Sequence, residues 1–274
     1  MAVVIPCFND GDLVEKAVAS VQEDEPVEIV VIDDGSTDAD TLAALQRLED
    51  AGTLVLRQVN AGPSVARMKG VHATSAPYIF PLDADDLMEP RALAALADAL
   101  DANDAAAFAF GDYRIFGEDN VRIHMPPWCP WSVMFKDLWV TSLLYRRRDL
   151  LAVGGWSFFI GYENWDLLMA FAEAGYDGVR IDEVTFQRRI QGRRRNAASR
   201  SRHGELYRML VTRHEGLFAR EAEIRRRASP PLWKRVAYPR LLGARPLPAL
   251  VYFTASKAKR RFYALQERGS RSRA

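Results

Sequence analysis

The sequence predicts an α/β fold in which helices flank an open, mostly parallel sheet. Short apolar runs rich in Val and Ile recur about every 25 residues, at residues 3–5, 29–32, 54–56 and 78–80. Runs of this length are typical of strands buried on both faces. Helical patterns separate them, and a hydrophobic content of 49% supplies a packed core.

The helices are predicted from apolar periodicity, in chain order. Residues 12–21 and 41–48 each place apolar side chains on one face, and Asp40 or Thr41 is a candidate N-cap for the second helix. Pro90 suits the first turn of a helix that runs to residue 100. Because strands and helices alternate, we expect βαβ crossovers and a ligand at the carboxyl ends of the strands.

Three further segments have weaker patterns. Residues 105–110 are predicted as a strand, residues 125–139 as a loop-rich surface with several Pro and Trp, and residues 158–175 as a helix. Beyond residue 188 the chain is rich in arginine and has a helical pattern.

Charge is divided unevenly along the chain, although the formal net charge is only +1. Residues 1–187 carry 13 Lys and Arg against 31 Asp and Glu, whereas residues 188–274 carry 24 against 5. We therefore expect an acidic body and a basic extension. Two cysteines without metal-ligand spacing exclude a disulfide framework and favour a cytoplasmic setting. We expect no leader, because the first predicted strand begins directly after Met1, and we expect no membrane span, because no apolar run reaches the required length.

Polar clusters follow all four predicted strands, which is where the sheet places a ligand. The clusters are Pro6-Cys7-Phe8-Asn9-Asp10, Asp33-Asp34-Gly35-Ser36, Asn60-Ala61-Gly62 and Asp83-Ala84-Asp85-Asp86. A single acidic pair after a strand is often only a turn or a cap. Four clusters at successive strand ends favour a common site.

These clusters, together with Gly161-Tyr162-Glu163-Asn164-Trp165-Asp166-Leu167, resemble the motifs of family 2 glycosyltransferases. The resemblance covers roughly residues 3–175, in the family's order and spacing. It implies a GT-A fold with an open, mixed and mostly parallel sheet. The expected domain spans residues 1–190, with a nucleotide-sugar half at 1–86 and an acceptor half at 87–190, followed by a basic helical extension at 191–274.

The acidic triplet has a chemical rationale. A diphosphate leaving group gains charge as its bond to the sugar breaks, and a divalent cation stabilises that charge. Mg²⁺ or Mn²⁺ prefers carboxylate and phosphate oxygens. The resemblance implies that Asp85 binds the metal and that Asp83 contacts the ribose. Asp86 is less certain, because it is also a candidate cap for the helix at Pro90.

The resemblance also assigns the nucleotide pocket. It implies that Pro6, Phe8 and Asp34 line the base, with Phe8 standing where the family often has Tyr. Arg67 matches a basic residue near the diphosphate, where a guanidinium can pair with phosphate oxygens. Alternatively, Arg67 is an ordinary surface arginine on the helix after Gly62, with no role in binding.

The catalytic motif departs from the family pattern. Inverting transfer needs a base that takes the proton of the acceptor hydroxyl. Many relatives have Glu-Asp, with the second acid as the proposed base, but here that position is Asn164. Glu163 is the first candidate for the base and Asp166 the second, although Asp166 is also consistent with a solvated charge in a first helical turn.

Two tryptophans next to this motif are candidates for the acceptor site. The rings of Trp156 and Trp165 can pack against the apolar face of a sugar. Core packing is the more common role of tryptophan, and it is the expectation for Trp128, Trp131 and Trp139.

The basic extension interleaves arginine clusters with Trp, Tyr and Leu. This pattern predicts an attachment to an anionic membrane surface, at the inner face of the cell membrane. A solvated helical face, or docking onto the acidic body, explains the pattern equally well. No nucleic-acid-binding motif accompanies the charge.

The sequence therefore predicts metal-dependent, inverting transfer of a sugar from a nucleotide-diphosphate donor, a UDP-sugar, to a glycan or lipid-linked acceptor. One alternative is a degenerate domain that acts as a membrane-attached binding module, which Asn164 favours. A sugar nucleotidyltransferase is another, but residues 6–13 contain one glycine and no Lys or Arg for a phosphate loop.

Overall fold

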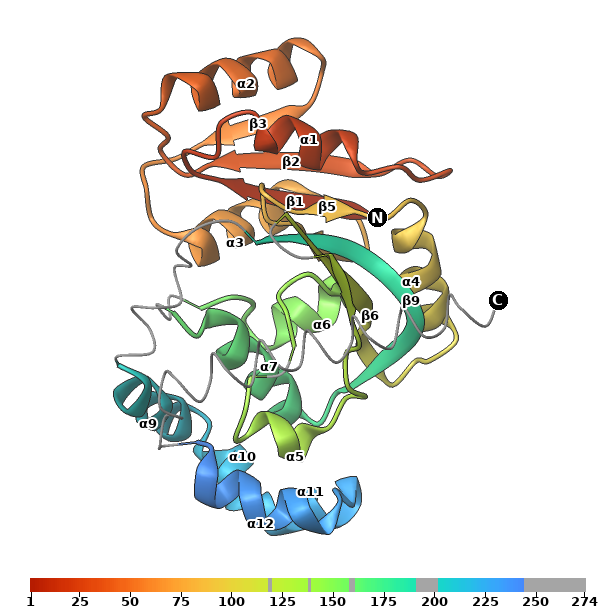
Figure 1. The fold of residues 1–274 in the computed structure, drawn as a ribbon, viewed down its shortest axis with the longest axis vertical. Helices are drawn as coiled ribbons and strands as arrows, with labels where there is room; N and C mark the ends of the chain where they lie inside the picture. Colours follow the sequence, from red (N-terminus) through yellow and green to blue (C-terminus); the bar gives the residue numbers. More distant parts are fainter. Residues whose placement is uncertain (118–119, 138, 158–160, 191–201, 244–274) are drawn as a thin grey trace.

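The computed structural model describes residues 1–117, 120–137, 139–157, 161–190 and 202–243. A single curled sheet runs through the molecule, with helices on both of its faces (Figure 1). The most C-terminal helices lie at the end of the molecule opposite helix α2 (Ala39–Asp50).

The first half of the sheet is parallel. Strand β1 (Ala2–Cys7) pairs with β2 (Glu28–Asp33) on one side and with β4 (Tyr78–Pro81) on the other, and β3 (Leu54–Arg57) pairs with β2. Residues 3–5 and 30–32 are fully buried, as expected for strands covered on both faces. All four strands predicted from the apolar runs are confirmed.

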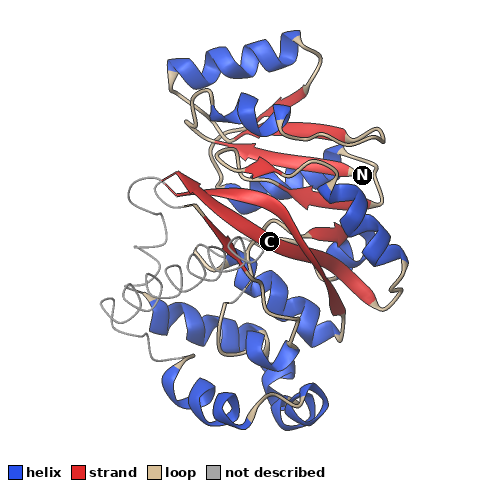
Figure 2. Ribbon diagram, turned by 45° about the vertical axis from the view of Figure 1, so that its right-hand side comes forward, coloured by secondary structure: helices blue, strands red, loops and turns tan. Residues whose placement is uncertain are grey.

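The second half of the sheet is mixed. Strand β8 (Leu144–Arg146) pairs antiparallel with β4 and with the long strand β6 (Ala106–Gly117). Strand β9 (Asp177–Ile190) runs parallel to β6 with register shifts near Asp112, and the short strands β5 (Leu87–Met88) and β7 (Val121–Ile123) pair antiparallel with β9 and β6. Figure 2 shows this part of the sheet curling across the first half.

The described residues form two large hydrophobic cores, one on each face of the sheet, and a small third cluster between β6, β7 and β9. Helices α1 (Leu13–Ala19), α2 and α4 (Ala92–Asp101) bury their apolar sides in the first core. Helices α3 (Pro63–Ala73), α5 (Pro130–Val133), α6 (Arg147–Ala152) and α7 (Glu163–Ala174) contribute to the second.

Three predicted helix starts needed correction. Pro90 is not in the first turn of α4, because that helix begins at Ala92. The N-cap of α2 is Asp38, whose carboxylate accepts from the Thr41 amide at 2.9 Å, in place of Asp40 or Thr41. Helix α7 begins at Glu163, later than predicted from the periodicity, and residues 158–160 lie outside the described residues.

The described part of the basic extension is helical, and it shares the second core. It consists of α9 (His203–Arg213), α10 (Glu215–Ala219), α11 (Glu221–Ala228) and α12 (Leu232–Leu241). Leu206, Leu210 and Leu217 are buried with α5 and α7, and the ring of Tyr238 stacks on Trp131 with centroids 5.9 Å apart. No helix within the described ranges is both long and apolar enough to cross a bilayer.

Candidate functional site

The strand order β3-β2-β1-β4 places a topological switch point at β1, because the chain moves outward on one side and then returns to the other. In open α/β sheets the ligand crevice lies at the carboxyl ends of the strands beside this point. The loops after β1, β2 and β4 are therefore the expected walls of a site.

The loops after β1 and β2 are hydrogen-bonded to each other. The side-chain oxygen of Asn9 accepts from the amides of Thr37 at 2.8 Å and Asp38 at 3.0 Å, and the Asn9 amide donates to the Ser36 hydroxyl at 3.1 Å. Asn9 takes a left-handed conformation, with φ of 55°. Sequence reasoning gave Asn9 no role, although Asn is among the few residues that readily adopt this backbone.

Asp34 organises the loop that follows β3. It is buried, and its two carboxylate oxygens accept from Gln58 Nε2 and from the amides of Ala61 and Gly62 at 2.8–2.9 Å. Gly35, with φ of 78°, allows the close approach, because a Cβ there would lie 2.8 Å from the Asn60 nitrogen. The structure thus gives Asp34 a positioning role, and its contact with a base stays a prediction.

Pro6 and Phe8 lie at the end of β1. Phe8 is 43% exposed, which is unusual for a large apolar ring, and Pro6 is half-buried. Between them Cys7 is buried, and burial raises the pKa of its thiol to about 12. The exposed ring of Phe8 lies at the carboxyl end of β1, and its contact with a nucleotide base stays a prediction.

The acidic triplet converges at the end of β4. Asp83, Asp85 and Asp86 each offer a carboxylate oxygen, and these oxygens lie within 4.8 Å of one another. Burial, followed by the nearby charge of Asp83, raises the pKa of Asp85. A hard divalent cation would relieve this repulsion, so the donor set fits Mg²⁺ or Mn²⁺.

Asp86 is the buried member of the triplet. Its carboxylate accepts from the Arg189 amide at 2.8 Å, and the desolvation of this site raises its pKa well above the usual range. The alternative reading of Asp86 as a helix cap is wrong, because α4 starts after Arg91 and Asp86 instead joins β9 to the β4 loop.

Arg67 is buried, so its alternative as a surface arginine is wrong. Its Nη2 pairs with Asp83 Oδ1 at 2.7 Å, and its guanidinium carbon lies 5.8 Å from the centre of the Trp156 ring. The pairing orients the carboxylate of Asp83, and the contacts of Arg67 and Asp83 with a nucleotide stay predictions.

Arg188, near the end of β9, was given no role by the sequence analysis, which noted it only as the start of the arginine-rich part of the chain. Burial lowers its pKa, but Tyr113 and the acids Asp86, Asp83 and Asp85 outweigh burial and raise it. The next residue, Arg189, donates from Nε to the Asp85 carbonyl at 3.1 Å. The acidic triplet therefore has an internal cation beside it.

Helix α7 carries the acceptor-side motif at its N-terminus. Glu163 accepts from the Gly161 amide at 3.0 Å, and its side chain is partly exposed. Asn164 Nδ2 donates to the Trp139 carbonyl at 3.1 Å, while its Oδ1 is buried with no hydrogen-bond partner among the described residues.

Asp166 faces away from this motif into the extension. It is 2% exposed and pairs with Arg213 at 2.8 Å and His214 at 3.0 Å, and it also accepts from the Ser157 hydroxyl. The alternative of a solvated first-turn charge is therefore wrong. A carboxylate this enclosed has no access to an acceptor hydroxyl, so we do not retain Asp166 as the base.

The acceptor roles of Trp156 and Trp165 also need correction. Both side chains are 3% exposed and belong to the second core. Trp165 Nε1 donates to the Val133 carbonyl at 2.5 Å, and its ring packs near Tyr207. Both rings are packed in the core, so neither offers a face to a sugar.

Known proteins resemble this chain over the same region. It is 36% identical over 189 residues to the uncharacterized glycosyltransferase YibD of Escherichia coli, covering 61% of this chain and 54% of the relative. It is 32% identical over 127 residues to the GalNAc(5)-diNAcBac-PP-undecaprenol beta-1,3-glucosyltransferase of Campylobacter jejuni, covering 44% and 40%. The chain thus spans about half or less of the length of these relatives.

A solved structure shares the fold. TarS of Staphylococcus aureus (residues 1–349), in complex with UDP-GlcNAc, matches with a TM-score of 0.65 and 17% identity, covering 77% of this chain and 65% of TarS. This confirms the predicted GT-A-type α/β architecture. The model of the family described as "Glycosyl transferase family 2" matches residues 2–163, more than half of the sequence, so the chain belongs to glycosyl transferase family 2.

Proposed function

We propose that the protein is an inverting, metal-assisted glycosyltransferase that moves a sugar from a nucleotide-diphosphate donor, a UDP-sugar, to a glycan or lipid-linked acceptor. The observation that carries the proposal is the convergence of Asp83, Asp85 and Asp86 within 4.8 Å at the end of β4. TarS, bound to UDP-GlcNAc, supports the donor class. The Campylobacter relative, named for an undecaprenol-linked acceptor, supports the acceptor class.

Each group of residues has a part in the proposed reaction. Pro6 and Phe8 would provide an apolar wall for the base, and Asp83 would contact the ribose, a role supported by its pairing with Arg67. A divalent ion held by Asp85 would supply the charge that stabilises the departing diphosphate. Arg188 adds a fixed positive charge next to the same acids. A carboxylate on the acceptor side, for which Glu163 is the sequence candidate, would accept the proton.

We also propose that the extension rests on an anionic bilayer through α12. Leu232 and Trp233 are 74% and 61% exposed, and Val236 on the same side is also exposed, while Tyr238 on the opposite side is buried. Lys234, Arg235 and Arg240 accompany them, and the helix has no acidic residue. An exposed apolar strip among cations suits a membrane interface. The basic clusters at 193–195 and 257–261 lie outside the described residues.

The donor and metal assignments are tested by binding. We expect Mn²⁺ to tighten UDP binding to the wild-type protein by about tenfold or more, because it bridges carboxylate and phosphate. Asp85→Ala should lose this gain while keeping its thermal stability. Isothermal titration with UDP, with and without Mn²⁺, measures the metal-dependent gain in the wild type and in the variant. The matched control is Asp104→Asn, because Asp104 is an exposed acid outside the triplet. A metal effect of equal size in Asp85→Ala would contradict the metal assignment.

A degenerate binding module is the second candidate, because Asn164 replaces the family's acid with an amide that is engaged with the Trp139 carbonyl. Measuring UDP release from a panel of UDP-sugars decides between the transferase and the binding module. UDP binding without turnover of any donor would favour the binding module, whereas turnover that is lost in Asp85→Ala would favour the transferase.

A further inference from the structure

We propose that Asp137, which no sequence motif includes, is the general base of the transfer in place of the acid missing at position 164. The inference rests on the proposed function and assigns one of its steps. The proton of the acceptor hydroxyl passes to a carboxylate oxygen of Asp137 while the acceptor oxygen bonds to the anomeric carbon. The bond between that carbon and the diphosphate oxygen breaks, and its electron pair leaves with the nucleoside diphosphate.

The backbone around Asp137 is anchored on both sides. The Phe135 carbonyl accepts from the Gly243 amide at 3.1 Å, and the Trp139 carbonyl accepts from Asn164 at 3.1 Å. Trp139 is itself buried, and its Nε1 donates to the Pro126 carbonyl at 3.3 Å. Asn164 therefore acts as a positioning residue, since its amide holds the segment from which the exposed side chain of Asp137 extends.

The charged groups that act on Asp137 belong to the candidate site. Its carboxylate interacts electrostatically with Glu163 at the start of α7 and Arg188 on β9, and with Tyr145 on β8. Arg188 also interacts with Asp83, Asp85 and Asp86. The guanidinium thus lies within reach of both the candidate metal ligands and Asp137.

The electrostatics suit proton transfer. Although the side chain is open to solvent, enough protein lies around it to desolvate the carboxylate and raise its pKa to about 7. Arg188 and Lys136 oppose this shift, and the negative charge of Glu163 adds to it. A base is most effective when its pKa lies near the working pH. Asp166, the other acid considered, is enclosed by its ion pairs.

The experiment compares Asp137→Asn, Glu163→Gln and the control Asp104→Asn. UDP release from UDP-glucose, UDP-galactose and UDP-GlcNAc with Mn²⁺ is measured between pH 5.5 and 8.5, and the affinity for UDP is measured separately. Because the carboxylate must be ionised to accept a proton, the wild-type rate should rise with pH through about 7. Asp137→Asn should lower kcat by about 100-fold or more and abolish this rise, with UDP affinity within threefold of wild type.

The variant Glu163→Gln shows which of the two acids, Asp137 or Glu163, is the general base. It removes a negative neighbour of Asp137, so the midpoint of the pH profile should move to lower pH while turnover persists. The assignment is overturned if Asp137→Asn keeps the wild-type rate and profile, if it loses UDP binding, or if Glu163→Gln alone abolishes turnover. If the wild-type protein turns over no donor, the proposed function itself is contradicted, and the assignment of a general base falls with it.

Discussion

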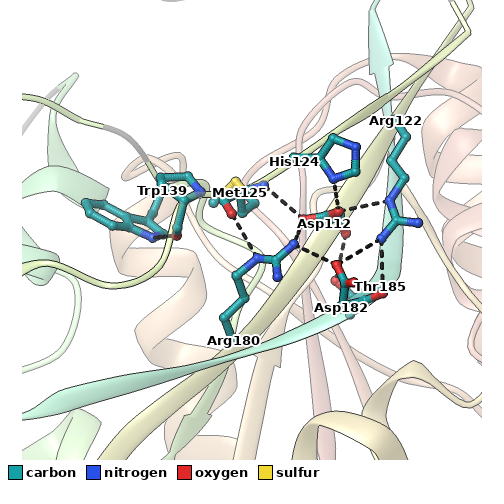
Figure 3. Close-up of polar contacts among 9 residues, drawn as sticks. Asp112, Arg122, His124, Met125, Trp139, Arg180, Asp182 and Thr185 are labelled. Atoms are coloured by element: carbon teal, nitrogen blue, oxygen red, sulfur yellow. Dashed lines mark hydrogen bonds and ion pairs between the residues drawn. The ribbon is translucent and has the colours of Figure 1, made fainter. Parts of the chain in front are cut away.

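Asp112 is a fully buried carboxylate in the middle of β6, at a register shift between β6 and β9. Its Oδ1 accepts from the Met125 amide at 2.9 Å and Arg180 at 2.7 Å, and its Oδ2 accepts from Arg122 at 2.9 Å and contacts His124 Nδ1 at 2.7 Å (Figure 3). Burial raises its pKa, but these contacts outweigh burial and hold the pKa below the usual value. One side chain thus joins β6, β9 and the segment after β7.

Asp112→Asn should destabilise the fold by about 3 kcal/mol, because it leaves two arginines without their buried counter-charge. Urea denaturation measures the free energy of unfolding. The matched control is Asp182→Asn, since Asp182 contacts the same arginines at 3.1 and 3.5 Å but is 83% exposed. That change should cost less than about 1 kcal/mol. Equal losses in the two variants would contradict a special role for the buried acid.

Residues whose partners are close in sequence could be predicted, whereas residues whose partners are distant in sequence could not. Asp83 and Asp85 were predicted because both follow one strand, whose end must face the ligand edge. Arg188 could not be predicted in the same way. Its position beside these acids depends on how β9 pairs with β6 and on the register shifts in that pairing. Trp165 is a donor to Val133, a partner 32 positions earlier that sequence spacing does not reveal.

At the scale of elements, helix α10 is joined to α7 by His214. This buried ring contacts Asp166 through Nε2 at 3.0 Å and Glu173 through Nδ1 at 2.9 Å. Burial lowers the pKa of His214, but the hydrogen bonds to the two acids outweigh burial and raise it. When protonated, the imidazole donates to both carboxylates at once.

The stability of the α7–α10 contact should therefore depend on pH. Because the folded pKa of His214 lies above its unfolded value, its contribution is fully present below about pH 6.5 and is lost as pH rises through the raised folded value. His214→Gln should lower stability by about 2 kcal/mol at pH 6 and by less at pH 9. Denaturation at both pH values, with the exposed His72→Gln as control, measures the difference. A loss that is independent of pH would contradict the charged pairing.

The elements themselves were largely predictable in the first hundred residues. There, strand length, β-branched composition and turn residues all favour the same parallel units, and local patterns decide the structure. In the second half, β6 and β9 are long strands whose alternation is interrupted near Asp112, so their pairing is decided by contacts across the sheet. The short α5 within 125–139 depends on packing against α7 and α11, which periodicity does not reveal.

At the scale of the whole molecule, the proposed membrane face lies at the end opposite α2 (Figure 1). The protein should sediment with vesicles of phosphatidylglycerol and phosphatidylcholine, and raised salt should release it, because each cation near the surface contributes about 1 kcal/mol. Trp233→Ser should weaken binding by about tenfold, since the ring no longer enters the interface. Leu42→Ser, an exposed apolar residue on α2, is the control. Equal binding to vesicles of phosphatidylcholine alone, or no effect of Trp233→Ser, would argue against this face.

The shared core of α5, α7 and α9–α12 has a consequence for engineering. Trp131 stacks on Tyr238 and donates to Glu221, so the apolar floor beneath the proposed acceptor side includes residues beyond 200. A fragment that stops at residue 190 would expose this apolar floor to water. Grafting a new acceptor preference from a relative will therefore require the transplant of residues 125–241 as one block, because neither portion has a complete interior without the other.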